Sequence, residues 1–361
     1  MNKKSCGFQI FPWIMFFFVF NLECKVPEDF SDIIEASKEV EVITGHFENK
    51  FIPKVAPRKI FDARQAEFLI YRVKWGMVEV TGNSYDTGMY WIGGFFHSNK
   101  SWDASWDDHK DFYGPTRNSA AINIKSASMT VSCLHCFNVH DAVRTNHAIN
   151  WVVQHTWGEY IRDDCIENDY LHSGRVYDCL FDGCYTGIST RAGSDNANSD
   201  GSNKVVVLDK LLIRLLPMPY PYKWGREETV IDANGDPYNG SGIPFGHSSF
   251  FKMSESERNP HYVIKNCVFM ATHFTKGSNL DFPPESLINV CQNNIIIWLG
   301  PGPYPGKLPV LKFPNAFKIV RGERGRELWR LLVRDWHARH PDVGASRKPD
   351  SPGSLEFPRK F

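Results

Sequence analysis

The sequence lacks an excess of charge of either sign and has little that suits a membrane span. Its 361 residues include 41 basic and 41 acidic side chains, so the formal net charge is zero. A balanced charge removes the electrostatic argument for nucleic acid as the main partner. The apolar run at residues 8–20 is broken by Gln9 and Pro12 and is short for a helix that spans a bilayer.

The beginning of the chain has the order of features that is typical of a secretory signal. Lys3 and Lys4 precede the apolar run, whose length matches the core of a signal peptide. We therefore expect residues 1–24 to be a signal peptide, or a membrane anchor where they are not cleaved. The remainder is expected to be secreted or periplasmic, with membrane contact only through an uncleaved N-terminal segment.

The chain also lacks the cysteine pattern of a disulfide or zinc framework. Seven cysteines lie beyond residue 24, and an odd number leaves at least one thiol unpaired. Cys133 and Cys136 have metal-like spacing, but no second Cys/His pair follows at zinc-finger distance. Because a buried cysteine behaves as a small apolar residue, we expect these thiols to be mostly reduced and to face a core.

Helical periodicity is missing through the middle of the chain, where short apolar segments end in Asp, Asn or Gly. Strands this short cannot bury an apolar side alone, so successive segments must stack on one another. Val131, Val152 and Val176 lie in comparable segments, at spacings of 21 (152 − 131) and 24 (176 − 152) residues. Val263 and Ile288 are 25 residues apart (288 − 263). These spacings favour a parallel β-solenoid over an antiparallel sandwich, which would show more hairpin turns such as Asn-Gly.

Helix signals are confined to the two ends of the chain. Residues 28–38 read as a short helix, and residues 325–340 as an amphipathic helix with Leu328, Leu331, Leu332 and Trp336 on one face. The first helix is expected to plug one open end of the solenoid, and the second to cap the other end or to dock on the solenoid. The expected organisation is residues 1–24 signal or anchor, 25–55 N-terminal cap, 56–310 β-solenoid, 311–344 C-terminal helical cap and 345–361 disordered tail.

The densest group of acidic residues lies in the short strands of residues 160–190. It consists of Asp163, Asp164, Glu167 and Asp169, with His172 nearby. Two adjacent Asp residues on a strand point to opposite faces unless a bulge re-aims one of them. Close carboxyl groups push one pKa upward, which would give the acid and the base that glycoside hydrolysis requires.

A structural role is the alternative for these acids, because Asp commonly caps strand ends by accepting hydrogen bonds from turn amides. Asp178 and Asp182, which close neighbouring segments, are expected to be such caps.

Two long polar segments, residues 99–118 and 217–247, interrupt the short strands. Loops of this length in a compact repeat fold are often functional. Their aromatic residues are candidates for stacking on sugar rings, on walls that flank the Asp163–Asp164 pair; they are Trp102, Trp106, Tyr222 and Trp224. Clustered carboxylates suit calcium, so a calcium site is a further candidate for the first segment, at Asp107, Asp108 and Asp111. No other cofactor is expected.

Residues 163–189 resemble a known family. Asp163-Asp164-Cys165-Ile166, followed by Gly187-Ile188-Ser189, is similar to motifs of polygalacturonase-type glycoside hydrolases in the pectate-lyase-like superfamily. The resemblance implies a right-handed parallel β-helix over about residues 55–300. Thr186 stands where those enzymes carry a histidine, and the nearest match to their Asn-Thr-Asp motif is at residues 144–147. Their Arg-Ile-Lys motif has no counterpart, although Arg191 lies just beyond Ser189.

The sequence therefore predicts a secreted protein that acts on a polysaccharide or oligosaccharide in an acidic, aromatic groove. One reading is hydrolysis by the carboxyl pair. A second is lyase or epimerase chemistry on a uronic acid, with Arg162, Arg175 or Arg191 neutralising the sugar carboxylate and calcium bound to the acids. A third is a non-catalytic protein that binds glycan in the same groove, or a surface β-helix.

Overall fold

A computed structural model of the protein describes residues 39–70, 73–83, 87–101, 119–126, 128–193, 196–219, 245–254, 257–272 and 279–344. The chain divides into two compact units, 1–37 and 38–361, and every described residue belongs to the second. The expected helix at 28–38 and the expected tail at 345–361 lie outside the described residues. None of the helices in the described ranges is both long and apolar enough to cross a lipid bilayer.

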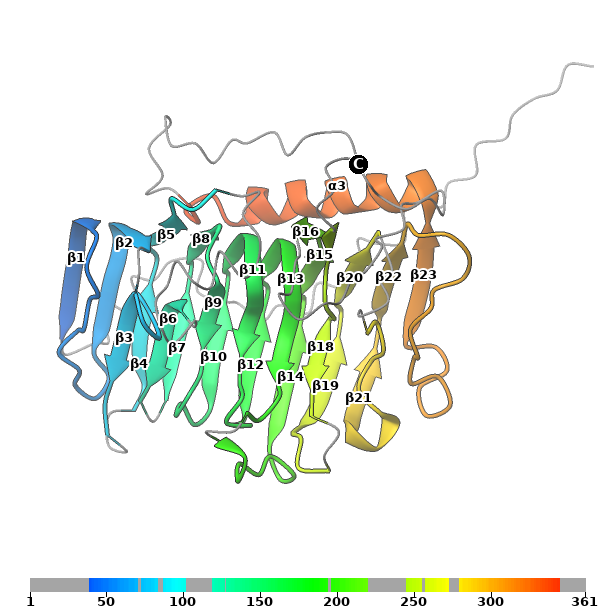
Figure 1. The fold of residues 1–361 in the computed structure, drawn as a ribbon, viewed down its shortest axis with the longest axis horizontal. Coiled ribbons are helices and arrows are strands. Elements are labelled where there is room, and N and C mark those ends of the chain that lie inside the picture. Colours follow the sequence, from blue (N-terminus) through cyan, green and yellow to red (C-terminus); the bar gives the residue numbers. More distant parts are fainter. Residues whose placement is uncertain are drawn as a thin grey trace, which may run out of the picture. The chain divides into compact units, whose positions relative to one another are not determined.

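The second unit is a right-handed parallel β-helix, as the sequence predicts (Figure 1). Its coils pass over three faces, and strands on one face pair in parallel with the strands of the next coil. The first face contains β4 (Met89–Ile92), β7 (Met129–Ser132), β10 (Trp151–Gln154), β12 (Gly174–Tyr177), β14 (Val205–Asp209), β19 (His261–Lys265) and β21 (Ile288–Gln292).

The second and third faces are joined in two coils by strands that continue around the corner between them. The second face contains β5 (Phe95–Ser98), β8 (His135–Phe137), the first parts of β11 (Trp157–Glu167) and β13 (Leu180–Thr190), β15 (Leu212–Leu215), β20 (Val268–Ala271), β22 (Asn294–Trp298) and β23 (Phe317–Arg321). The third face contains β3 (Val78–Thr81), β6 (Ala120–Lys125), β9 (Asp141–Arg144), the last parts of β11 and β13, and β18 (Phe251–Met253).

A few elements depart from this three-faced pattern. β1 (Val40–Phe47) and β2 (Ile60–Ile70) each span the first two faces at the N-terminal end of the stack. β16 (Met218–Pro219) and β17 (Phe245–Gly246) form a short antiparallel pair, and Glu285–Leu287 form a single turn of 3₁₀ helix.

The core is a stack of inward side chains in register from coil to coil. Val131 pairs with Val153, and Val153 with Val176, at offsets of 22 (153 − 131) and 23 (176 − 153) residues. The predicted period is therefore confirmed, but the inward residue of β10 is Val153 and not its neighbour Val152, which is half-buried. The seven cysteines beyond residue 24 are all free and buried, as expected.

The corner between the first and second faces, called here the first corner, is built by single left-handed residues. Cys133, His155, Asp178 and Lys210 occupy this place in four successive coils, with φ between 45° and 60°. Such a conformation costs a non-glycine residue roughly 1–2 kcal/mol. Hydrogen bonds between successive coils stabilise these corners. The amide of Cys133 donates to Gln154 O, and the amide of Asp178 donates to Asp209 O.

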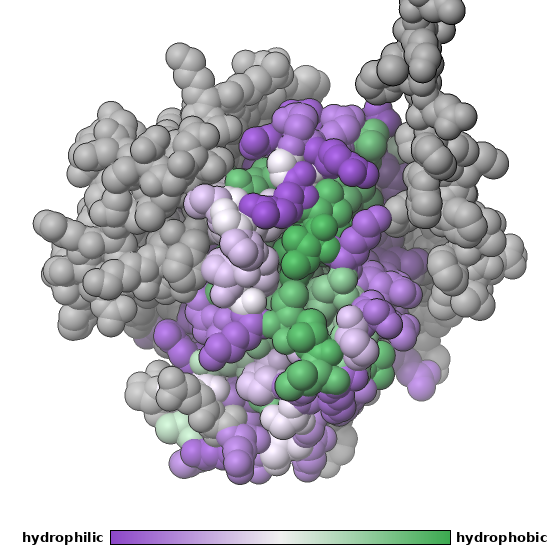
Figure 2. All heavy atoms as spheres, turned by 90° about the vertical axis from the view of Figure 1, so that its right-hand side faces the viewer, coloured by the Kyte–Doolittle hydropathy of each residue, from purple (hydrophilic) through white to green (hydrophobic). Residues whose placement is uncertain are grey.

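The C-terminal end of the stack presents an apolar surface. Figure 2 looks onto this end and shows a band of hydrophobic residues between hydrophilic ones. Among the described strands, β23 pairs with β22 alone. Ile319 on β23 is 45% exposed, and Leu311 in the preceding turn is 91% exposed.

The C-terminal helix, α3 (Gly322–Arg339), lies along the side of the stack, across second-face strands (Figure 1). It is therefore a docked helix, the second of the two roles that its sequence suggested, and does not close an end. Its buried residues are Gly325, Trp329 and Trp336, whereas Leu331, expected on the inner face, is 42% exposed.

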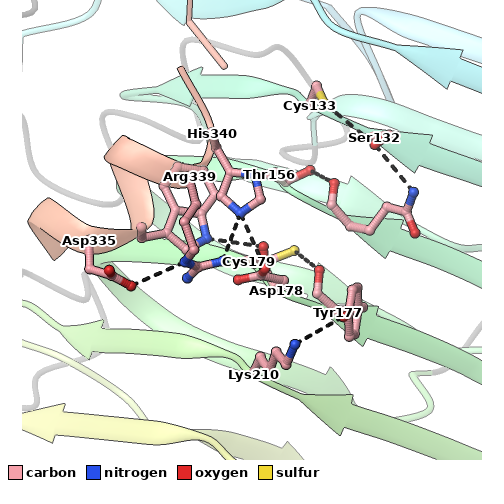
Figure 3. A network of polar contacts seen from close by, with 12 residues as sticks. Ser132, Cys133, Thr156, Tyr177, Asp178, Cys179, Lys210, Asp335, Arg339 and His340 are labelled. Carbon is pink, nitrogen blue, oxygen red and sulfur yellow. Dashed lines mark hydrogen bonds and ion pairs between the residues drawn. The ribbon is translucent and has the colours of Figure 1, made fainter. Parts of the chain in front are cut away.

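Asp178 and Asp182 anchor this helix, and do not cap strand ends as expected. Trp329 donates its indole N–H to Asp182 Oδ1 at 3.1 Å, and Trp336 donates its own to Asp178 O at 3.1 Å. Arg339 Nη1 lies 2.6 Å from Asp178 Oδ2 (Figure 3). The acids are thus bound to side chains about 150 residues further along the chain.

A histidine pair at the first corner makes this docking sensitive to acid. The rings of His155 and His340 stack with centroids 4.8 Å apart, and His340 Nε2 lies 3.2 Å from Asp178 Oδ2. Burial lowers the pKa of His155 to about 4, helped by the nearby charges of His340, Arg339 and Lys210 and opposed by Asp178. The pKa of Asp178 is lowered to about 2, despite burial, by hydrogen bonds from His340 and Arg339.

We expect acid to weaken the folded state through His155. Its depressed pKa means that its contribution is complete above about pH 6.5 and is lost as the pH falls towards 4, a difference of roughly 3 kcal/mol. Asp178 loses its own contribution only at lower pH, as the pH falls from about 3.8 towards 2. Urea unfolding at pH 7 and at pH 4.5 would measure the effect.

The matched control is His155→Asn, because Asn cannot titrate and tolerates the left-handed conformation of this corner (φ 48°). Groups remote from the first corner are unaffected by this change, so the difference between the two proteins reports on His155 and the groups in contact with it. Equal pH dependence of the wild type and of this variant would contradict the assignment.

Candidate functional site

A cluster of carboxyl groups lies at the corner between the second and third faces, called here the second corner. Asp163 and Asp164 sit where β11 bends between these faces, and the register with β13 shifts between Ile161 and Asp164. That irregularity re-aims the pair, as the sequence requires if both side chains are to serve one site. Both carboxyls lie within 4.0 Å of the same ammonium group, that of Lys252.

Asp141 belongs to the same corner, one coil earlier. It is the first residue of β9, and its Oδ1 accepts a hydrogen bond from the Asp164 backbone amide at 3.1 Å. The neighbouring amide of Asp163 donates to His140 O at 2.8 Å, and His140 Nε2 lies 3.5 Å from Asp163 Oδ2. Stacking of successive coils therefore brings three aspartates together.

Lys252 reaches the cluster from β18, two coils later. Its position follows from the ladder on the third face, where Glu167 pairs with Ser189 and Ser189 with Lys252. The ammonium lies 2.7 and 3.0 Å from the two oxygens of Asp164 and 3.7 Å from Asp163 Oδ1. This one cation therefore binds the aspartate pair.

Burial sets the electrostatics of the site. It raises the pKa of Asp164 to about 6, because desolvation and the charges of Asp163 and Asp169 outweigh the attraction of Lys252. The pKa of Asp169 is also raised to about 6, by burial and the charge of Glu167. Burial alone would lower the pKa of Lys252, but the charges of Asp163, Asp164 and Asp169 raise it.

The acids differ in their access to solvent. The side chain of Asp163 is 12% exposed and that of Lys252 17%, whereas that of Asp164 is only 2% exposed. A molecule at the second corner would therefore meet Asp163 and Lys252 first, with Asp164 directly behind them.

Other predicted residues support the cluster. Glu167 is buried and its Oε1 accepts a hydrogen bond from Arg144 Nη2 at 2.8 Å. Asp169 Oδ1 accepts hydrogen bonds from Ser189 Oγ at 2.8 Å and from the amide of Arg191, whose residue is exposed at the rim. These contacts fix the third-face side of the cluster.

Two predicted residues lie elsewhere. Arg162 is completely buried, and its Nη1 donates to the hydroxyl of Tyr160 at 3.0 Å, so it is not positioned to contact a substrate. His172 has His147 and Lys204 as its charged neighbours, and burial lowers its pKa. The charges of the aspartate pair that it was expected to assist are not among those that shift its pKa.

The residues expected to form the walls of the groove belong to the two long polar segments. Trp102, Trp106, Tyr222, Trp224 and the calcium candidates Asp107, Asp108 and Asp111 lie outside the described residues. The described ends of both long segments nevertheless lie at the second corner. The first segment connects Ser98, at the end of a second-face strand, to Ala120, at the start of a third-face strand. The second segment likewise connects Leu215 on the second face to Phe251 on the third.

The cluster is dense enough to surround a cation. Two sets of side chains, His140–Asp141–Asp163 and Asp141–Asp164–Glu167, each have ligand atoms within 4.8 Å of one another. Cations of the described chain already engage these acids: the ammonium of Lys252 lies beside Asp163 and Asp164, and the guanidinium of Arg144 is paired with Glu167.

Asp141 and Lys252 are the functional candidates that the sequence prediction missed. A signal for Asp141 existed, because Asp163 follows it by 22 residues (163 − 141), which is the coil offset from Val131 to Val153. The nearest match to the family's Asn-Thr-Asp motif, at residues 144–147, begins three residues after Asp141. Lys252 had no comparable signal, since it is 88 residues from Asp164 and follows a long interruption of the repeat. The chain matches no protein-family model, no curated protein and no solved structure.

Proposed function

We propose that this β-helix protein is a secreted, carbohydrate-active protein that cleaves a polysaccharide by hydrolysis at the second corner. The observation that carries the proposal is the adjacent pair Asp163 and Asp164, aimed at one place by the bend in β11 but differing in burial. Two carboxyl groups in unequal environments are what glycoside hydrolysis requires.

The environments suggest a role for each acid. Asp164, with a pKa of about 6, would be protonated in mildly acidic solution and would donate its proton to the leaving glycosidic oxygen. Asp163, nearer to solvent, would activate a water molecule or attack the sugar directly. Lys252 would stabilise the negative charge left on Asp164 after proton transfer.

Hydrolysis fits these contacts better than lyase or epimerase chemistry. Elimination next to a uronic acid needs a cation that is available to the sugar carboxylate, together with a base for the α-proton. Lys252 is already bound by two carboxylates, and Arg162 is buried. Arg191 at the rim is the described cation that would be left for such a role.

Membership of the pectate-lyase-like superfamily is part of the same proposal. The parallel β-helix and the place of Asp163-Asp164-Cys165-Ile166 at a bend in β11 support it. Thr186, at the position of the family's histidine, is the register partner of Asp164 in the next coil. This departure is the reason to test the reaction type directly.

The test is incubation of purified protein with a panel of neutral and uronic-acid polysaccharides. New reducing ends without ultraviolet absorbance from an unsaturated uronide would support hydrolysis. That absorbance would indicate a lyase, and a changed sugar configuration without cleavage would indicate an epimerase. Retention on a glycan column with no product would favour the alternative, a non-catalytic glycan-binding protein.

A further inference from the structure

Asp141 and Glu167 face each other across adjacent coils, and each is fixed by only one of its oxygens. Asp141 Oδ1 accepts the Asp164 amide at 3.1 Å, and Glu167 Oε1 accepts Arg144 Nη2 at 2.8 Å. One oxygen of each carboxyl group lies within 4.8 Å of the other group. Both residues are almost completely buried, at 1% and 4% exposure.

The remaining two oxygens have no donor. Within the described part of the chain, neither Asp141 Oδ2 nor Glu167 Oε2 receives a hydrogen bond from any group. Two ionised carboxylates cannot hydrogen-bond to each other, and a buried polar atom without a partner destabilises the folded state. A single proton between these oxygens would satisfy both.

We propose that Asp141 and Glu167 share one proton, carried by Asp141, and that this hydrogen-bonded link is a positioning device for Asp164. The link holds Asp141 rigidly between Glu167 on one side and the Asp164 amide on the other. It thereby fixes the backbone of β11 at the bend that aims the aspartate pair. Asp141 is in this view a positioning residue and does not itself touch a substrate.

The surrounding charges assign the proton to Asp141. Glu167 is ion-paired with Arg144, which favours its ionised form, whereas none of the described Lys, Arg or His residues forms an ion pair with Asp141. The titratable and charged groups around the pair are His140, Arg144, Asp163, Asp164, Asp169 and Lys252. Burial and the charges of Glu167, Asp163 and Asp164 raise the pKa of Asp141 well above its usual value, in agreement with the geometry.

Infrared spectroscopy in D₂O at pH 8 tests the shared proton without any activity assay. The carbonyl stretch of a protonated carboxylic acid is separate from that of carboxylates, so the wild type should show a band of about one acid group. Asp141→Asn should lose this band, because an amide can accept from the Asp164 amide and donate to Glu167 with no titrating proton. Asp209→Asn is the matched control: Asp209 is also buried, but is bound by Arg175 and Lys265, so the band should remain.

A wild-type protein without the band, or a band that persists in Asp141→Asn, would overturn the shared proton. Metal analysis of the same samples that found one tightly bound divalent ion, together with no band, would also overturn it, since a cation would then join the two oxygens.

The positioning role rests on the proposed function and is tested separately, once the panel has yielded a substrate. Asp141→Asn should keep its rate within about tenfold of the wild type, whereas Asp141→Ala should lose roughly 10–100-fold in kcat with KM little changed, as expected for a residue that acts through another. Loss of rate in Asp141→Asn as severe as in Asp164→Asn would make Asp141 a catalytic residue and end the positioning role. An inactive wild type would count against the proposed function alone and would leave the infrared result standing.

Discussion

Asp164→Asn is expected to lower the rate on a substrate found in the panel by roughly 10²–10⁴-fold, the usual contribution of general acid–base catalysis. The change preserves the shape of the side chain and removes its proton donor. Binding should be retained, because Asn keeps the size of the side chain and the more exposed Asp163 and Lys252 are unchanged. Initial rates over a range of substrate concentrations would separate kcat from KM.

The pH profile adds a second readout to this prediction. The pKa of Asp164 is raised to about 6, so wild-type activity that depends on its protonated form should decline as the pH rises through that value. The decline should be missing from the residual activity of Asp164→Asn. Asp182→Asn, which removes a carboxylate bound to Arg214 and Trp329 on the second face, is the matched control and should keep the wild-type rate and profile.

Full activity in a double variant, Asp163→Asn with Asp164→Asn, would remove the pair from the site. The acids of the segment at residues 103–111 would then become the next candidates. Because the pair is also bound to Lys252, thermal unfolding of each variant must accompany the kinetics, so that lost activity is not mistaken for lost fold.

Lys252→Met is expected to destabilise the protein by about 3–5 kcal/mol at pH 7, because it removes one partner of a buried ion pair. Methionine has a similar length and an apolar end, so packing changes little while Asp163 and Asp164 lose their shared cation. Denaturant unfolding monitored by circular dichroism would measure the loss.

This loss should shrink in mild acid. The pKa values of Asp164 and Asp169 are raised to about 6, so both take up protons as the pH falls below that value, and repulsion in the cluster declines. Lys265→Met is the matched control: it removes a lysine from Asp209, which keeps Arg175 as a partner, and should cost no more than about 1 kcal/mol. A Lys252→Met protein as stable as this control at pH 7 would show that Lys252 does not balance the cluster.

Much of the fold could be predicted because each coil of this repeat is formed by a short, continuous stretch of sequence. The valines of β7, β10 and β12 recur at nearly constant spacing, and a buried stack requires that recurrence. Aligning Val152, and not Val153, with Val131 and Val176 is an error of one residue in register. Such a shift moves a side chain from the core to the outer face of the same strand. The docking of α3 was harder to predict. An amphipathic pattern indicates that one face of a helix is buried, but it does not identify the surface against which that face packs.

The site could be predicted only where it is local in sequence. Asp163 and Asp164 stand out as adjacent acids, but their cation comes from β18, after an interruption that makes the coil from Leu208 to Ile264 56 residues long (264 − 208). An interruption of that length hides the period, so nothing in the sequence aligned Lys252 with Ser189. Asp178 and Asp182 were misassigned for a related reason, since their partners on α3 are remote in sequence.

The docking of α3 also has a consequence for the order in which the protein acquires its structure. Coil pairs form between segments that are close in sequence, whereas the hydrogen bonds from α3 to Asp178 and Asp182 span 147 to 162 residues. Contacts of such separation form late, after the coils that carry their partners are in place. During synthesis the helix leaves the ribosome after those coils, so the part of the second face that it covers stays exposed to solvent until α3 has been made. A nascent chain released before residue 322 would thus expose the very surface on which α3 packs.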